Sequence, residues 1–360
     1  MKSNYIIILL ISLLSGSCVT PYDITPNYVE AIVIEGMITD QPGPYVVTIS
    51  KSIPLDEQLQ TKGLLSGAAV IISDDLGNSE TLVEKSKGNY YTTLFQGVIG
   101  RSYSITITVE DKSYQSASEK LLPVGDFVVR YQFEQNEDPN TNQQITSTNG
   151  FNFYVDSELL PEQEGRVWWR WNGTFHYVTY PQNHTRFISG FKGAVVEVPD
   201  APPCAFSNTD GYQCHDCWVT RYNQTPLLSD KKFIENDQIK SLKIGFAEVN
   251  RRSFYDKYYL EVEQLSLSAS VYDFWKSVKT GKGNSSNLFQ TPPPKTIGNI
   301  KATLDEAIPV LGYFSASSVK KHSVTLDRSE VPYPIWNMDP FNDVCALLYT
   351  NASYKKPKFW

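Results

Sequence analysis

Hydrophobic and polar residues alternate over short stretches through most of this chain, which is the pattern of half-buried β-strands. The clearest stretch contains Tyr103, Ile105, Ile107 and Val109, whose side chains fall on one face of an extended strand. Turn sequences such as DDLGN at residues 74–78 separate these stretches. Turns repeated at intervals of about 8 to 12 residues favour a sandwich of two sheets. We therefore predict a β-sandwich over residues 29–122.

A second β-rich region follows Pro123 and Gly125 and covers residues 123–360. Its strand patterns are strongly aromatic, as in RVWWRWNGTFHYVTY, which begins at residue 166. Further along, Tyr258, Leu260 and Val262 share one face of a predicted strand and are expected in a core. The fold class predicted for the whole chain is mainly β, with two β-sandwich-like domains.

One segment, near residues 269–280, has the periodicity of a helix instead. Ser268 or Ser270 is placed to cap its start, and Gly281 and Gly283 are expected to end it. The apolar positions at helical spacing are Val271, Phe274, Trp275 and Val278.

The first residues have the pattern of a lipoprotein signal peptide. Lys2 precedes an apolar stretch from residue 6 to residue 14, which is shorter than the roughly 20 residues that span a bilayer. Small residues then lead to Cys18, so we expect residues 1–17 to be removed and Cys18 to carry lipid chains such as palmitate. Residues 18–28 would be the tether. The alternative is an ordinary secretory signal with a chance cysteine.

Composition narrows the class of protein. The net charge is −7, which argues against a nucleic-acid partner because such proteins normally present a basic face. No other apolar run reaches the length of a transmembrane helix. The chain has 22 Tyr, 17 Phe and 7 Trp, and this aromatic content favours strands.

Four further cysteines, Cys204, Cys214, Cys217 and Cys345, suggest two disulfides in an exported chain. Of the three possible pairings, we favour those that join Cys345 to Cys214 or Cys217, because they pin the C-terminal tail to the middle of the chain. A zinc site formed by Cys214, Cys217, Cys204 and His215 or Cys345 is one alternative. A redox C-x-x-C is another, although no βαβ pattern surrounds it.

A cluster of aromatic residues supplies the candidate binding residues Trp168, Trp169, Trp171 and Tyr177. On a strand, Trp169 and Trp171 share one face and Trp168 lies on the other. Both faces cannot easily be core, so one tryptophan is a candidate for exposure, and exposed tryptophans mark protein interfaces or sugar stacking. The alternative, which ordinary burial statistics favour, is that all of them sit in a sandwich core or under the C-terminal tail.

Apart from the cysteine alternatives above, the sequence contains no recognised catalytic or metal-binding pattern. The four histidines are not at metal-ligand spacing, and no G-x-S-x-G segment supports a hydrolase. We therefore predict a protein that is not an enzyme and that needs no cofactor or metal.

Several short motifs resemble known families when they are taken in order. The N-terminal order G-x-I-T-D, G-A-x-V, G-x-Y and Y-x-I-x-I-x-V resembles transthyretin-like, carboxypeptidase-regulatory modules or other immunoglobulin-like sandwiches. Over nearly the whole mature chain, the sequence resembles the DUF4249 family of Bacteroidota lipoproteins. The segments that carry this resemblance are EGMITD (35–40), GAAV (67–70), Cys217-Trp218, YLEVEQLS (259–266), Tyr272 with Trp275, LFQTPPP (288–294), GNI (298–300), GYFSAS (312–317) and KPKFW (356–360).

The resemblance implies a location more than a mechanism. Family members resemble outer-membrane lipoproteins and are typically encoded beside TonB-dependent receptors, and no catalytic residues are established for them. Members often carry a close cysteine pair before the C-terminal tail, whereas here Cys345 stands alone.

We therefore expect a non-catalytic, outer-membrane lipoprotein, on either the periplasmic or the cell-surface face. It would act as an accessory or binding subunit with a TonB-dependent receptor or another β-barrel. The alternatives are a surface glycan- or peptide-binding protein and, last, a hydrolase in an unfamiliar β fold.

Overall fold

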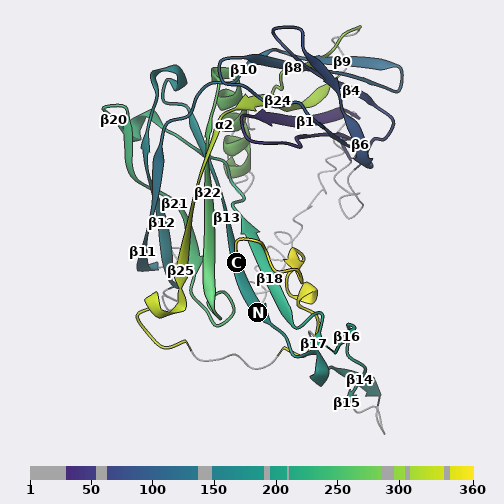
Figure 1. The fold of residues 1–360 in the computed structure, drawn as a ribbon, viewed down its shortest axis with the longest axis vertical. Helices are drawn as coiled ribbons and strands as arrows, with labels where there is room; N and C mark the ends of the chain where they lie inside the picture. The colour runs from purple at the N-terminus through teal and green to yellow at the C-terminus, as the bar shows by residue number, and fades with distance from the viewer. Residues whose placement is uncertain are drawn as a thin grey trace, which may run out of the picture.

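The computed structural model describes residues 30–53, 63–136, 148–189, 195–208, 211–284, 296–304, 309–335 and 341–360. The chain is mainly β and forms two sandwiches, which Figure 1 shows as a transverse upper body and a body of long, steep strands below it. The predicted fold class is therefore confirmed. A pair of short hairpins projects from the lower body.

The upper sandwich packs two six-stranded sheets face to face. Its core includes Tyr103, Ile105, Ile107 and Val109, the alternating residues that the sequence places on one face. The first sheet contains β1 (Ile32–Thr39), β2 (Val46–Lys51), β3 (Gly63–Leu64), β6 (Val83–Ser86), β7 (Asn89–Tyr91) and β24 (Val310–Ser317). The second contains β4 (Ala69–Asp74), β5 (Ser79–Thr81), β8 (Ser102–Val109), β9 (Lys112–Ser116), β10 (Glu119–Lys120) and β23 (Ile300–Ala302).

Two strands of this sandwich come from the far end of the chain. β24 pairs in parallel with β1, and β23 pairs antiparallel with β9. Phe314 and Ala316 of β24 enter the same core as β1. The predicted division into residues 29–122 and 123–360 therefore leaves out two strands of the first sandwich, because both β23 and β24 contribute buried side chains to its core.

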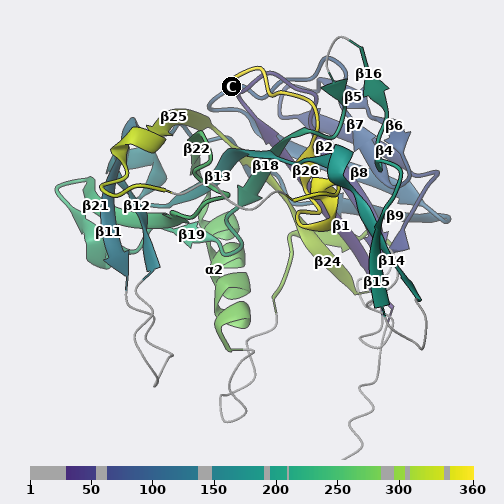
Figure 2. The same cartoon turned by 90° about the horizontal axis from the view of Figure 1, so that it is seen from below.

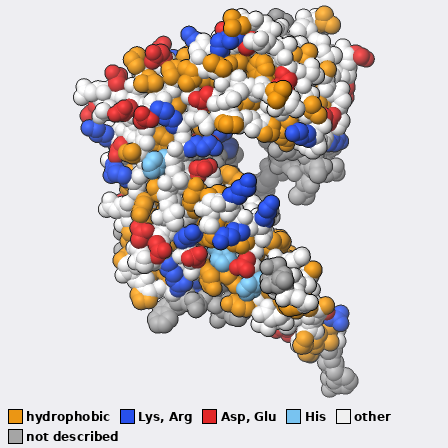
Figure 3. Space-filling model, viewed as in Figure 1, with side chains coloured by type: hydrophobic (Ala, Val, Ile, Leu, Met, Phe, Trp, Pro, Cys, Tyr) orange, Lys and Arg blue, Asp and Glu red, His pale blue; other side chains and the backbone are white. Residues whose placement is uncertain are grey.

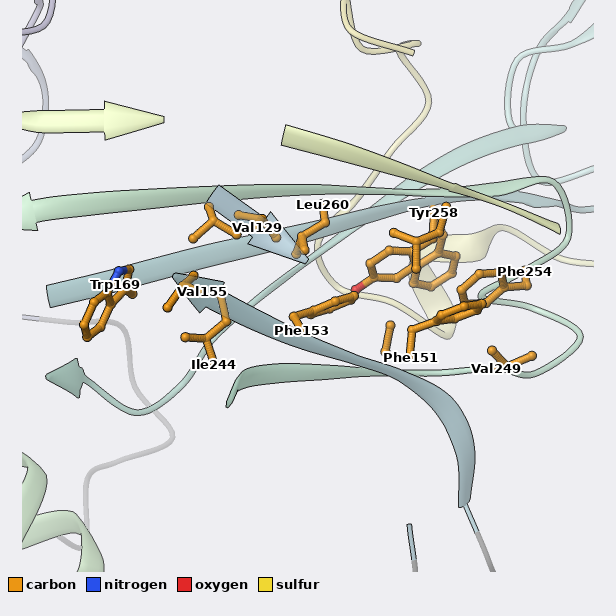
Figure 4. Packing of buried hydrophobic residues seen from close by; sticks show 14 of the residues in the cluster. Val129, Phe151, Phe153, Val155, Trp169, Ile244, Val249, Phe254, Tyr258 and Leu260 are labelled. Atoms are coloured by element: carbon orange, nitrogen blue, oxygen red, sulfur yellow. The ribbon is translucent and has the colours of Figure 1, made fainter. Parts of the chain in front are cut away.

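The lower sandwich packs a four-stranded sheet on a six-stranded sheet. Its core is dominated by aromatic rings, and Figure 4 shows Phe151, Phe153, Phe254 and Tyr258 packed between the strands. The smaller sheet contains β11 (Phe127–Asn136), β12 (Thr148–Glu158), β20 (Ile234–Glu235) and β21 (Gln238–Glu248). The larger sheet contains β13 (Val167–Val178), β18 (Asp216–Tyr222), β19 (Leu227–Leu228), β22 (Lys257–Ser266), β25 (Val319–Asp327) and β26 (Ala352–Ser353).

Helix α2 (Ala269–Asn284) confirms the predicted helix and runs alongside the lower body in Figure 2. Ser268 caps it, since its Oγ accepts a hydrogen bond from the backbone N–H of Val271 at 3.3 Å. The helix continues through Gly281 and Gly283, so the prediction that these glycines end it is wrong. Short 3₁₀ turns occur at Pro161–Gln163, Pro181–Asn183, Lys231–Phe233, Arg328–Glu330 and Cys345–Leu347.

A third apolar cluster joins the two sandwiches through α2. It combines Val271 of the helix, Trp168 and Leu265 of the lower sheet, and Tyr313 of the upper sheet. β24 and β25 are separated only by Ser318, so one nearly continuous run of chain belongs to both bodies. Burial of this cluster and the shared strand run fix the two sandwiches against each other.

A buried carboxylate strengthens the same junction. Glu119, 3% exposed, accepts hydrogen bonds from the hydroxyls of Ser268 (2.7 Å), Ser270 (3.0 Å) and Tyr313 (2.6 Å) and from the amide of Asn299 (3.0 Å). Burial, together with Glu119, raises the pKa of the Tyr313 hydroxyl, which keeps it a donor. Four donors offset the cost of burying this charge.

Candidate binding groove and projecting arm

A groove of about 600 Å³ lies at the junction of the two sandwiches. One wall is the outer face of the upper sheet, where Glu35 and Thr48 lie opposite each other on β1 and β2. These side chains point outward because their neighbours Ile34 and Ile49 fill the core. The opposite wall is formed by Phe274, Trp275 and Val278 of α2 and by Trp168 and Arg170 of β13.

Aromatic rings make up most of the second wall and its floor. The Trp168 and Trp275 ring centroids are 4.6 Å apart, and Phe274 lies edge-on to Trp275 at 5.3 Å. Phe274 also contacts Tyr313 of the upper sheet, with centroids 4.6 Å apart. Trp275 is half-buried, so part of its ring faces the groove while the rest is packed.

The residues that line the groove include one basic side chain, Arg170, and one acidic side chain, Glu35. Arg170 lies over the Trp168 ring, with its guanidinium carbon 5.3 Å from the ring centroid, and donates to Glu263 at 2.5 Å. Glu263 also pairs with Lys321 at 2.7 Å. Burial raises the pKa of the Glu263 carboxyl, but Arg170 and Lys321 outweigh burial and hold the pKa below its ordinary value. Glu263 therefore fixes Arg170 in place as an ionised partner.

Three polar groups of the groove residues lack partners among the described residues. The indole Nε1 of Trp168 and the Nε of Arg170 are buried donors without acceptors. The side-chain carboxylate of Glu35, on the other wall, forms no hydrogen bond or ion pair in the described part of the chain. The two walls differ in charge, since one carries the Arg170 guanidinium and the other the Glu35 carboxylate.

The structure places the predicted binding aromatics mostly in the core. Trp169 (0% exposed) donates to Gln264 at 2.7 Å, and Tyr177 (3% exposed) also packs in the core of the lower sandwich, so these two are not surface binding residues. Trp171 is half-buried on the same face and donates to the Ile244 carbonyl at 2.8 Å. Trp168 lies on the opposite face, as predicted, and is the member of the set that reaches the groove.

The expectation that both faces of this strand cannot be core is wrong. One face of β13 packs on the smaller sheet of the lower sandwich, and α2 covers Trp168 on the other. Trp275 was predicted as a helix residue but not as a binding residue, and neither Glu35 nor Arg170 was predicted as a site residue. Alternation gave a signal for Glu35, an acidic residue between two core positions, but did not show what lies opposite it.

The second candidate surface is an arm that projects from the lower sandwich, formed by β14 (Thr185–Ser189), β15 (Val195–Pro199), β16 (Phe206–Ser207) and β17 (Gly211–Tyr212). β14 and β15 pair only with each other. Their register places Ile188 beside Val196 and Ser189 beside Val195. Figure 3 shows hydrophobic side chains on this arm, at the lower right.

Apolar side chains are exposed on both faces of the β14–β15 ribbon. Phe187 and Val195, each 72% exposed, lie on one face, and Ile188 and Val196 lie on the other. Phe206, 61% exposed, extends the surface toward the base of the arm. An isolated two-stranded ribbon is at best marginally stable in water, so a surface of this kind suits contact with another molecule.

Two disulfides hold the arm and the tail. Cys204 pairs with Cys214 at the base of the arm, and Cys217 pairs with Cys345 of the C-terminal tail. The expectation of two disulfides, with the tail joined to residue 214 or 217, is confirmed. These two disulfides take up all four of the cysteines that the zinc-site and free C-x-x-C alternatives would need as thiolates.

The lipid-attachment candidate Cys18 and the tether lie outside the described residues. Among the helices of the described ranges, none is both long and apolar enough to cross a membrane. Within those same ranges, no three His, Cys, Asp or Glu side chains are grouped to hold a metal ion.

A comparison with known families assigns the chain to one of them. The family described as "Domain of unknown function (DUF4249)" matches residues 19–323, and the chain belongs to this family. The match covers the upper sandwich, including β24, and the lower sandwich as far as Ser323 of β25, so β26 and the C-terminal tail lie beyond it. No curated protein matches the sequence with significance.

Proposed function

We propose that this protein is a non-catalytic lipoprotein of the outer membrane of a member of the Bacteroidota. It is anchored through Cys18 and works as an accessory or binding subunit of a TonB-dependent receptor or another β-barrel. The signal-peptide pattern ending at Cys18 supports the anchor, and the membership in the DUF4249 family supports the setting.

The exposed apolar arm is the observation that supports a protein partner. Phe187 and Val195 on one face and Ile188 and Val196 on the other would lose water on contact with a partner. The Cys204–Cys214 disulfide lies at the base of the arm and restrains it, which lowers the entropy lost on binding. A restrained apolar ribbon is suited to docking against a protein surface such as the rim of a barrel.

Co-purification tests this proposal. The full chain, expressed with an affinity tag in its native host and extracted in mild detergent, should bring a β-barrel protein with it. The double variant F187S/V195S should lose the barrel, because its arm no longer offers an apolar face. The matched control is L94S, which changes a side chain that is 93% exposed on the upper sandwich and away from the arm. Recovery of the full chain without any barrel would refute the proposal.

Anchoring is tested separately with the variant C18S. Without the thiol, no diacylglyceryl group can be attached, so the protein should leave the membrane fraction or keep its signal peptide. Metabolic labelling with palmitate, followed by the gel mobility of both forms, reports the outcome. Equal labelling of wild type and C18S would show that Cys18 is not the site.

A second candidate function, binding of a surface glycan or peptide, is favoured by one specific observation. The groove between the sandwiches presents partly exposed Trp275 together with Arg170 and Glu35. This function is compatible with the first, because a receptor's accessory subunit can hold the ligand that the receptor takes up.

A further inference from the structure

We infer that the groove between the upper sheet and α2 binds a neutral oligosaccharide. The inference deepens the proposed function, because it names the ligand class of a binding subunit. It rests on the side chains of the groove and not on the arm or the lipid anchor.

The aromatic wall suits the apolar face of a sugar ring. Trp275, in contact with Trp168 and Phe274, forms a supported platform of indole and phenyl rings. The C–H groups on one face of a pyranose stack on such a platform, and the packed neighbours keep it from rotating away. The volume of about 600 Å³ falls in the range of small-molecule sites, which extends from roughly 300 to 1,000 Å³.

The charges of the groove favour a ligand without net charge. Arg170 would repel a cationic ligand, and Glu35, which has no described partner, would repel an anionic one. Hydroxyl groups both donate and accept, so a neutral sugar can donate to the Glu35 carboxylate and accept from Arg170.

The groove is already held in shape by its surroundings. Glu263 and the Trp168 ring orient Arg170, and Glu119 ties the start of α2 to Tyr313 of the upper sheet. The ligand therefore meets an ordered wall on each side, and less binding free energy is lost in ordering side chains.

A peptide fits this groove less well. Peptides that bind as extended strands add to an open sheet edge and pair with its backbone. Here the groove wall is the face of β24, β1 and β2. β1 and β2 lie inside the sheet, and at the outer edge of β24 the backbone N–H and carbonyl of Phe314 are bonded to the side chain of Asn299. The polar side chains that line the groove, among them Glu35, Thr48 and Arg170, offer hydrogen bonds at separate points, as the hydroxyls of a sugar require.

The test uses the full lipidated chain in a detergent without a sugar headgroup. Intrinsic tryptophan fluorescence is titrated with tetrasaccharides of glucose, mannose, xylose and N-acetylglucosamine. The fully deacetylated chitotetraose, which is cationic, and sialyllactose, which is anionic, serve as charged comparison ligands. At least one neutral tetrasaccharide should bind, and binding of the N-acetylglucosamine tetramer should exceed that of its deacetylated form.

Two groove variants and one control locate the site. W275A should weaken binding about tenfold or more, which corresponds to about 1.4 kcal/mol. E35Q changes an exposed side chain with no described partner, so it should fold normally and weaken binding several-fold. W360A, which removes a tryptophan of the C-terminal tail outside the groove, should bind like wild type.

The inference is overturned if no neutral tetrasaccharide binds, if W275A and E35Q bind like wild type, or if charged ligands or a random peptide library bind instead. These outcomes are independent of the proposed partner. A chain that binds sugar but recovers no barrel refutes only the docking proposal, and a chain that recovers a barrel but binds no sugar refutes only this inference.

Discussion

The disulfide between Cys217 and Cys345 is expected to contribute more stability than the one between Cys204 and Cys214. The first closes a loop with a sequence separation of 128 residues, and the second a loop of 10. In the chain-entropy treatment the stabilisation grows with the logarithm of loop length, which gives about 5 kcal/mol for the long loop and about 2.7 kcal/mol for the short one. The difference is about 2 kcal/mol, a large share of the 5–15 kcal/mol typical of a folded domain.

The perturbation is the double variant C217S/C345S, and the matched control is C204S/C214S. Both remove one disulfide from buried or half-buried positions and leave no unpaired thiol behind. Urea unfolding followed by tryptophan fluorescence gives the free energy of unfolding of each variant. Limited proteolysis adds a local readout, because residues 341–360 should become the first cleavage site in C217S/C345S alone.

Contacts other than the disulfide also hold the C-terminal tail. The tail packs on the lower core through Leu348 and Tyr349, and β26 pairs with β18. If these contacts alone hold the tail, C217S/C345S will lose no more stability than C204S/C214S and its tail will resist the protease. That result would refute the chain-entropy argument for this molecule.

Three further predictions follow from single contacts. G173A should lose several kcal/mol in urea unfolding, because a Cβ at residue 173 would lie 1.8 Å from the Tyr258 hydroxyl, and a loss below about 0.5 kcal/mol would contradict this packing. E119Q should cost about 1.5 to 3 kcal/mol in the same assay, since its amide cannot accept from all of the donors that surround the carboxylate, and unchanged stability would show that the buried charge is unimportant. The lowered pKa of Glu263 means that its contribution is complete above the pKa of the unfolded state, near 4.5, and is lost as the pH falls through the folded value. Wild type should therefore lose more stability than E263Q between pH 6 and pH 3, and parallel losses would exclude the pairing with Arg170.

Local sequence predicts strands well here because alternation reports directly which side chains face a core. The stretch from Tyr103 to Val109 lies with its apolar face in the core, and the residues of 258–262 do so as well. The helix near 269–280 was predictable from its period and from Ser268, but its end was not, since the helix continues past Gly281 to Asn284.

Only part of the candidate site could be predicted from the sequence. The opposite orientation of Trp168 and Trp169 follows from the strand period, and the structure confirms it. Whether Trp168 is covered depends on α2, which is about 100 residues further along the chain. Arg170 and Glu35 belong to one groove only because two sheets that are distant in sequence meet there.

The sequence by itself determined the strand-rich character, the helix near residues 269–280, the even set of four cysteines beyond Cys18 and the family, because each of these depends on composition or on local spacing. The tertiary structure alone decided that β24 completes the first sandwich, that Cys217 rather than Cys214 holds the tail, and that a groove forms beside α2. The physical reason is that pairing between distant segments is selected by burial of complementary surfaces. Alternation states which face of a strand is apolar, but it does not state which other strand will cover that face.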